Sequence, residues 1–214
     1  MDIFKEKELL RKSVYDNLFN NGFSNRENGD YGKIPDFKGS DIAALNLSKT
    51  EEWKNSKTIF CSPDSAQIPV RYFALKDAKN LIMASPNLEH GYLFLSGKLS
   101  KCDDLTIHKA STKEGAFEYC SKIDCFPKID LVVEGSVAVD KFGNRIGKGK
   151  GFADREIADL FKRDLISKNT PLVTTIHPLQ LVDSVPIESH DMKLNIVVTT
   201  DEVIGVWFIS FYSS

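Results

Sequence analysis

The sequence has no long apolar run. Nothing in its 214 residues approaches the roughly 18–20 consecutive apolar residues that a membrane-spanning helix needs. Residues 1–12, MDIFKEKELLRK, lack the apolar core of a secretory signal peptide, and they are not an Arg- and Ser-rich transit segment. These absences predict a cytoplasmic protein without a membrane partner.

Cysteine and histidine are scarce. The cysteines form no C-x-x-C pair, and no histidine lies at metal-ligand spacing from them. In a cytoplasmic protein such cysteines are small apolar fillers that stay reduced. The pattern therefore argues against a zinc site and against a disulfide framework. The residues in question are Cys61, Cys102, Cys120 and Cys125.

An excess of basic charge is also missing, because 28 Lys and Arg face 30 Asp and Glu for a net charge of −2. Such a chain has no overall positive field to attract nucleic acid. At 42% hydrophobic residues it is long enough for one well-buried domain. With no repeat, low-complexity tract or linker, we predict a single domain over residues 1–214, as a monomer or a homodimer.

Short apolar runs alternate with amphipathic segments, which is typical of an α/β protein with a mainly parallel sheet. Strands are predicted at 58–61, 81–84, 92–95, 131–133, 172–176, 195–199 and 203–208. Helices are predicted at 2–20, 40–47, 70–78, 114–122 and 153–165. Residues 21–39 are rich in Asn, Gly and Asp, which predicts a long loop, either a lid or an irregular insertion.

The spacing of apolar residues also predicts which helical positions face the core. Asp2 and Ser40 are the expected N-caps of the first two helices. The expected inward residues are Ile3, Leu9, Leu10, Val14 and Leu18, then Ile42, Ala43 and Leu45, then Phe117 and Cys120, and finally Ile157, Leu160, Phe161 and Leu165.

The central stretch 130–154 places a glycine-rich, basic loop between an apolar strand and an amphipathic helix. Glycines let backbone N–H groups close around an anion, and the helix N-terminus adds its positive dipole end. Each Gly-Lys pair is followed by glycine, so the loop is no P-loop, and its G-x-G-x-G spacing is no dinucleotide fingerprint. The loop alone predicts a phosphate site, with a flexible basic turn as the alternative.

The longer pattern D-K-x-G-N-R-x-G-x-G-x-G-F-x-D-R at 140–155 resembles the signature of the 5-formyltetrahydrofolate cyclo-ligase (methenyltetrahydrofolate synthetase) family. Lys7 and Arg11 resemble its N-terminal K-x-x-x-R, and 186–191 with 197–200 resemble its P-x-E-x-H-D and V-V-T segments. The middle of the chain is closer to the divergent methenyltetrahydrofolate synthetase domain-containing branch, through 34–39 and 69–72.

The resemblance implies a three-layer α/β/α fold of the NagB/RpiA/CoA-transferase kind, with its site at the carboxyl ends of the strands. It also implies ATP and Mg²⁺ as cofactors and a reduced folate or related pterin as the other substrate. In the family, ATP phosphorylates the formyl oxygen of 5-formyltetrahydrofolate, N10 attacks the activated carbon, and 5,10-methenyltetrahydrofolate forms with release of ADP and phosphate.

By match to the family, Arg145 and Lys150 are the predicted catalytic residues, and Asp154 and Asp191 the predicted metal ligands. Each assignment has an alternative. Asp154 could instead cap the helix, and Asp191 could be a turn residue. Lys7 and Arg11 could belong to a solvated charged face of the first helix. The predicted nucleotide-binding residues are Lys7, Arg11, Arg145, Gly147, Lys148, Gly149, Lys150, Gly151, Phe152, Ala153 and Asp154. The predicted substrate-binding residues are Gln67, Arg71, Lys148 and Phe152.

Three departures from the family pattern affect the folate side. Ala153 replaces the second of two aromatics, Gln67 replaces a glutamate, and Ser136 replaces a glycine. The nucleotide half of the predicted site is thus better preserved than the folate half. This leaves an alternative function, a nucleotide-binding homologue that acts on another substrate or serves as a non-catalytic binding module. An RNA association in the divergent branch comes with an added RNA-recognition domain, whose aromatic pattern this sequence does not show.

Overall fold

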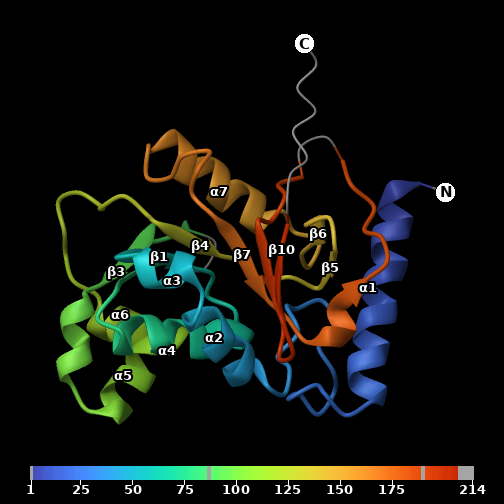
Figure 1. Ribbon diagram of the computed structural model, residues 1–214, viewed down its shortest axis with the longest axis horizontal. Helices are drawn as coiled ribbons and strands as arrows, with labels where there is room; N and C mark the ends of the chain where they lie inside the picture. Colours follow the sequence, from blue (N-terminus) through green and yellow to red (C-terminus); the bar gives the residue numbers. More distant parts are fainter. Residues whose placement is uncertain (1, 86–87, 189–190, 207–214) are drawn as a thin grey trace.

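A seven-stranded sheet forms the centre of the computed structural model, which describes residues 2–85, 88–188 and 191–206 (Figure 1). The strand order is β10-β9-β7-β4-β1-β2-β3. The five central strands run parallel, and β3 and β10 join the edges antiparallel. The strands are β1 (Thr58–Cys61), β2 (Asn80–Ala84), β3 (Tyr92–Leu95), β4 (Leu131–Val133), β7 (Leu172–Thr175), β9 (Ile196–Val198) and β10 (Val203–Gly205). The predicted mainly parallel sheet is confirmed, and residues 207–208 of the predicted last strand lie outside the described residues.

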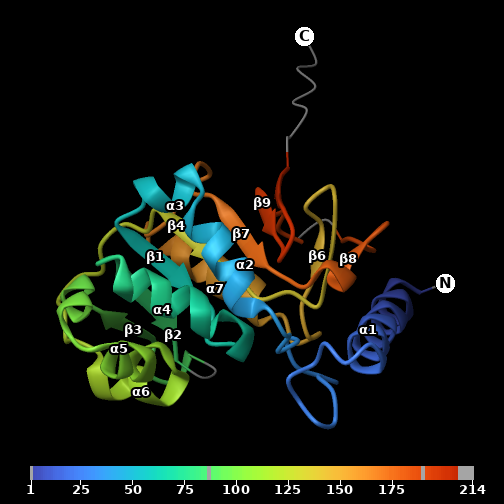
Figure 2. The ribbon, with the colours of Figure 1, turned by 60° about the horizontal axis from the view of Figure 1, so that its bottom comes forward.

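Helices cover both faces of this sheet and make the predicted three-layer α/β/α fold. Figures 1 and 2 show α7 on one face and α2, α4, α5 and α6 on the other. Successive residues of a strand point to opposite faces of the sheet and pack into two separate hydrophobic cores. Ile59 belongs to the core that contains Trp53, and Phe60 belongs to the core that contains Leu160. The helices are α1 (Ile3–Asn20), α2 (Ser40–Ser48), α3 (Glu51–Asn55), α4 (Ile68–Lys76), α5 (Asp104–Ser111), α6 (Lys113–Tyr119) and α7 (Phe152–Lys162), with 3₁₀ turns η1 (Ser65–Gln67), η3 (Gly97–Lys101) and η4 (Pro178–Gln180).

A second, three-stranded sheet lies between the central sheet and α1, and the sequence did not predict it (Figure 1). Asp140 organises it, since Oδ1 accepts from the backbone N–H groups of Phe142 and Asn144 at 2.9 and 3.1 Å, and Oδ2 accepts from Val185 N–H at 3.0 Å. The sheet packs against the apolar side of α1, which it holds in place. Its order is β6-β5-β8, with β5 (Ala138–Asp140), β6 (Arg145–Ile146) and β8 (Leu181–Val182).

The long loop 21–39 is a packed insertion. The buried Asp30 carboxylate accepts from Ser24 Oγ at 2.7 Å, Arg26 Nη1 at 2.7 Å and Asp36 N–H at 2.9 Å. Phe37 is fully buried in a small cluster of its own. The irregular-insertion interpretation therefore describes this segment, because its polar backbone is held by an internal carboxylate.

Several local predictions are wrong. Asp2 caps α1 as expected, but Gly39, at φ +89°, is the N-cap of α2 in place of Ser40. Helices α3 and α5 were missed, and α4 begins and ends two residues earlier than predicted. Five residues expected to face the core are exposed, because each helix packs through a narrower stripe than its apolar content suggests. They are Leu9, Ile42, Leu45, Phe117 and Phe161.

Among the residues that the structure describes, no helix combines the length and the apolar character needed to cross a bilayer.

Candidate functional site

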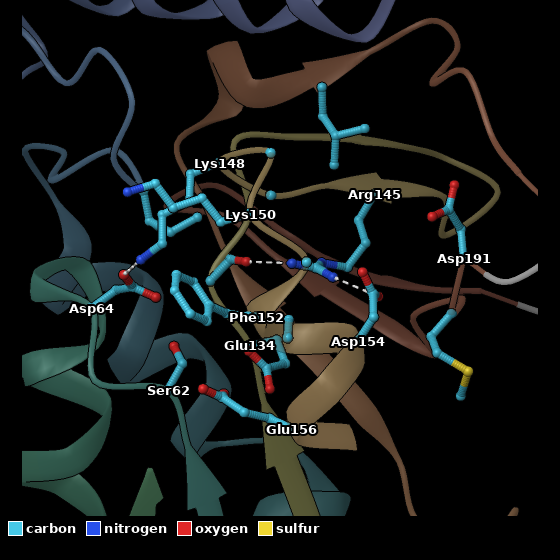
Figure 3. Close-up of a pocket in the computed structure, with 18 of the residues that line it drawn as sticks. Ser62, Asp64, Glu134, Arg145, Lys148, Lys150, Phe152, Asp154, Glu156 and Asp191 are labelled. Carbon is cyan, nitrogen blue, oxygen red and sulfur yellow. Dashed lines mark hydrogen bonds and ion pairs between the residues drawn. The ribbon is translucent and has the colours of Figure 1, made fainter. Parts of the chain in front are cut away.

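A cavity of about 460 Å³ opens at the carboxyl ends of β1 and β4, the position at which α/β sheets bind ligands (Figure 3). Its walls come from segments far apart in the sequence: the first turns of α1, the strand ends 62–64 and 134–135, the loop 145–151, the start of α7, and the segment around Glu188 and Asp191. Most of the predicted site residues therefore meet at one place.

The glycine loop includes two residues in the left-handed region of backbone conformation. Gly149 and Gly151 have φ angles of +84° and +60°, which residues with a Cβ rarely adopt. A Cβ on Gly149 would also lie 3.3 Å from Arg11 Cζ. Gly151 is the N-cap of α7 without a side-chain capping bond, so the N-terminal N–H groups of this helix remain available near the cavity. The rival role of Asp154 as the helix cap is not what the structure shows.

Two arginines are fixed against this loop. Arg11 Nε donates to the carbonyl of Gly147 at 2.7 Å, and its other end pairs with Glu8. Arg145 Nη2 donates to the carbonyl of Gly135 at 2.9 Å, and Arg145 Nη1 lies 3.8 Å from Asp154 Oδ1. Backbone carbonyls thus orient both guanidinium groups before any ligand enters.

Two lysines complete the basic side of the cavity. Lys148 Nζ lies 3.1 Å from Asp64 Oδ1 and 5.5 Å from the centre of the Phe152 ring. Lys150 is exposed at the opening. Arg155 contacts the Phe152 ring as well, so this aromatic side chain is held by two cations.

Lys7 already has carboxylate partners. Its Nζ donates to Glu188 Oε2 and to Asp191 Oδ2, each at 2.8 Å. Burial opposes the charge, but the hydrogen bonds to the two carboxylates outweigh it and raise the pKa of Lys7. Lys7 and Arg11 are each only 8% exposed, so the solvated-face alternative is wrong. His190, which belongs to the matched segment, lies outside the described residues.

The metal prediction for Asp154 and Asp191 stays a prediction. Both line the cavity, but no three Asp, Glu, His or Cys side chains converge on a common point within the described residues. Carboxylate oxygens are nevertheless the ligands that Mg²⁺ prefers, and Mg²⁺ often uses one or two of them with phosphate oxygens and water. The donor set therefore fits a magnesium ion that arrives with a nucleotide.

Two predicted substrate residues do not line the cavity. Gln67 and Arg71 are 0% exposed, and Gln67 Nε2 donates to Thr175 Oγ1 at 3.3 Å. Arg71 donates to the carbonyls of Ser111, at 2.7 Å, and of Asp64, at 3.1 Å. Arg71 thus supports the strand-end segment that forms the cavity wall, and the structure brings neither residue to the ligand side of that wall.

Sequence reasoning missed the acidic floor of the cavity. Glu134 follows β4, and Glu156 lies on α7 with its side chain near it in Figure 3. Burial raises the pKa of Glu134 well above its usual range, and the charge of Glu156 adds to this rise. Burial also raises the pKa of Glu156 to about 7, with Asp64 contributing. The available signal was the position of Glu134 directly after an apolar strand, where α/β sheets place ligand contacts.

Comparison with solved structures supports the fold. The structure resembles 5,10-methenyltetrahydrofolate synthetase from Aquifex aeolicus with a TM-score of 0.59 at 23% identity, over 94% of this chain and 92% of that one. It resembles the 5,10-methenyltetrahydrofolate synthetase from Mycoplasma pneumoniae with a TM-score of 0.52 at 14% identity, over 97% and 100% of the two chains.

Sequence comparisons identify the family. The chain is 33% identical to the bovine methenyltetrahydrofolate synthase domain-containing protein over 92% of its length, and 32% identical to the human one over 93%. It spans about half the length of these relatives, 53% in both cases. A 76-residue segment is 34% identical to the Escherichia coli 5-formyltetrahydrofolate cyclo-ligase, covering 36% of this chain and 39% of that protein. Since the sequence model of the 5-formyltetrahydrofolate cyclo-ligase family matches residues 5–200, the chain belongs to that family.

Proposed function

We propose that this protein binds ATP with Mg²⁺ at the basic side of its cavity and uses it to convert 5-formyltetrahydrofolate to 5,10-methenyltetrahydrofolate, with release of ADP and phosphate. One observation carries the proposal: Arg11, Arg145, Lys148 and Lys150 surround the glycine loop beside the open N-terminus of α7. This arrangement suits a polyphosphate, because fixed positive groups and backbone N–H donors both stabilise its charge.

Each cation has a role that follows from its place. Arg11 and Lys7, which reach the cavity from α1, bind the phosphate chain and fix its position. Arg145 and Lys150 neutralise the negative charge that develops on the transferred phosphoryl group. The protein's remaining task is alignment, since holding the formyl oxygen near the γ-phosphate converts an encounter into an intramolecular step.

The metal ion supplies additional positive charge when it is bound, and Asp154 and Asp191 are its proposed ligands. The ion pair between Asp191 and Lys7 supports this assignment, because the carboxylate already faces a cation at the cavity. A bound phosphate chain would compete with Asp191 for Lys7 and leave the carboxylate free to hold a metal ion.

The direct test incubates purified protein with ATP, Mg²⁺ and 5-formyltetrahydrofolate and follows the absorbance of the methenyl product. The expected result is product formation that requires both ATP and metal. Normal ATP binding without product would refute the proposed cyclo-ligase reaction and would still support the proposed nucleotide site.

A second candidate is a homologue that uses the same nucleotide site on another substrate. The placement of Gln67 favours it, because the position that carries a glutamate in the family is here a neutral amide that is buried and does not line the cavity. Turnover of ATP with a different formylated or carboxylated compound, and none with 5-formyltetrahydrofolate, would select this candidate.

A further inference from the structure

The cavity ends in a floor made by two neighbouring strands. Ser62 follows β1 and Glu134 follows β4, and the last residues of these strands, Cys61 and Val133, are paired in the parallel sheet. Both side chains line the cavity, and Figure 3 shows them gathered with Glu156 at one end of it. The strand register alone therefore brings a hydroxyl and a carboxyl group together.

Each group has a buried polar atom without a hydrogen-bond partner among the described residues. Ser62 and Glu134 are each 2% exposed, and neither Ser62 Oγ nor Glu134 Oε1 has a hydrogen-bond partner among the described residues. A buried polar atom without a hydrogen bond costs free energy, more so when it belongs to a carboxyl group. Two such atoms on the same cavity floor indicate a ligand whose polar atoms form the missing hydrogen bonds.

The loop side and the floor of the cavity carry different charged groups. The loop side carries Arg11, Lys148 and Lys150, which suit phosphate, whereas the floor carries Glu134 and Glu156. Burial raises the pKa of Glu134 and the charge of Glu156 adds to the rise, while Arg145 opposes it, so the ionised form of Glu134 is poorly stabilised by the protein alone. A ligand with N–H donors stabilises that ionised form, whereas an anionic group does not.

We propose that Ser62 and Glu134 form a specificity subsite for a planar, nitrogen-rich head group with two adjacent N–H donors, of the aminopyrimidine or amidine type. On binding, Glu134 is ionised and its two carboxylate oxygens accept from the paired donors, while the Ser62 hydroxyl bonds to a neighbouring ring atom. This proposal rests on the proposed function, in which the head group is the pterin ring of the second substrate. Glu134 then supplies the carboxylate that Gln67, outside the cavity, does not.

The experiment measures the binding of separate fragments by titration calorimetry. The probes are 6-methyltetrahydropterin as the head alone, p-aminobenzoylglutamate as the tail alone, Mg-ATP, and Mg²⁺ without nucleotide. The proteins are the full chain and its Glu134→Gln, Ser62→Ala and Glu118→Gln variants. Glu118 is the matched control, because it is exposed on α6, pairs with Lys109 and does not line the cavity.

The expected result is that Glu134→Gln weakens the head fragment at least tenfold, Ser62→Ala weakens it about threefold, and Glu118→Gln changes nothing. Tail and Mg-ATP affinities stay the same in all four proteins. Thermal unfolding of each variant reports whether it folds, and Glu134→Gln is expected to fold because the amide has the shape of the carboxyl group without its buried charge.

Three outcomes overturn the subsite: head binding that Glu134→Gln leaves unchanged, no head binding to the wild-type chain at millimolar concentration, or nucleotide-free Mg²⁺ binding that Glu134→Gln abolishes, which would assign the carboxylate to metal. Failure of the proposed function looks different. If the head fragment binds in a way that depends on Glu134 but no methenyl product forms, the subsite is supported and the proposed reaction is refuted.

Discussion

The cations of the cavity differ in how firmly the protein holds them. Arg11 and Arg145 are oriented by backbone carbonyls, whereas Lys150 extends from the exposed part of the loop. Groups that are positioned before binding lose little freedom when the ligand arrives. Lys150 therefore contributes charge that can be removed without disturbing the packing around it.

Lys150→Ala is expected to weaken ATP binding about tenfold, the effect of losing one charge-assisted hydrogen bond. The fold is expected to keep its thermal midpoint. Lys141→Ala is the matched control, since Lys141 is exposed in the same region of the chain and lies against Phe142, outside the cavity. Titration calorimetry with Mg-ATP compares the two. Equal ATP affinity in wild type and Lys150→Ala would contradict the phosphate role of the loop.

At the scale of single elements, the glycine loop shows what sequence patterns can and cannot predict. The positive φ angles at Gly149 and Gly151 follow directly from glycine's freedom and were foreseeable. The contact between Gly149 and Arg11 was not, because it depends on how the second sheet holds α1 beside the loop. That sheet was missed since its strands are only two or three residues long and are set by the hydrogen bonds of Asp140.

Gly149→Ala is expected to destabilise the protein by about 1 kcal/mol through its backbone angle, and to push Arg11 away from the loop. ATP affinity falls as a result. Gly22→Ala is the matched control, because Gly22 has a φ of +72° with no atom within 4 Å of an added Cβ. Denaturant unfolding and ATP titration of both variants separate the two effects. The proposal that Arg11 acts at the loop is contradicted if both variants bind ATP alike.

The buried face of α1 also could not be predicted from the spacing of apolar residues. The buried stripe of α1 includes Lys7 and Arg11 as well as Val14 and Leu18, while Leu9 is exposed. A pattern based on apolar spacing assigns buried positions to apolar residues. The pattern fails where a helix turns cations inward to a polar cavity, and this failure marks the side of α1 that faces the cavity.

His177 links two parts of the molecule and is the residue from which we expect a pH response. His177 follows β7 and stacks on Phe23, with ring centres 4.2 Å apart, so it joins the 21–39 insertion to the central sheet. Its Nδ1 accepts a hydrogen bond from Leu179 N–H at 3.1 Å, which requires an unprotonated nitrogen. Burial lowers the pKa of His177 below its ordinary value, against the opposing charge of Asp201.

The sign of the pH effect follows from this lowered pKa. Below about pH 6.5 the unfolded chain takes up a proton that the folded chain still excludes, so the His177 contribution to the free energy of unfolding falls as pH decreases from 7 to 5. Glu156, whose pKa burial raises to about 7, contributes with the opposite sign, so the effect of His177 is measured as the difference between wild type and variant. His177→Asn keeps an acceptor at the turn and is expected to reduce this fall. His108→Asn, at an exposed position of α5, is expected to leave it unchanged. The measurement is the urea midpoint of unfolding of each protein between pH 5 and 7. If the midpoint depends on pH in the same way in wild type and His177→Asn, the proposed role of His177 is refuted.

Across the molecule, the order of strands and helices could be predicted because the parallel strands are continuous apolar runs, as in Leu131–Val133. Arg145, Lys148 and Lys150 could be predicted because they stand together in one loop, whereas Lys7 and Arg11 of α1 were predicted by resemblance to the family.

The floor of the cavity could not be predicted, since Ser62, Glu134 and Glu156 come from three separate elements, and only the completed sheet shows that they meet.

The contact of Lys7 with Glu188 and Asp191 joins residues 181 and 184 positions apart. During synthesis, the lysine of the first helix can therefore reach those carboxylates only after the segment that carries Glu188 and Asp191 has left the ribosome. A nascent chain arrested ahead of that point has an unfinished pocket, so ligands cannot assist its folding until translation of this stretch is nearly over.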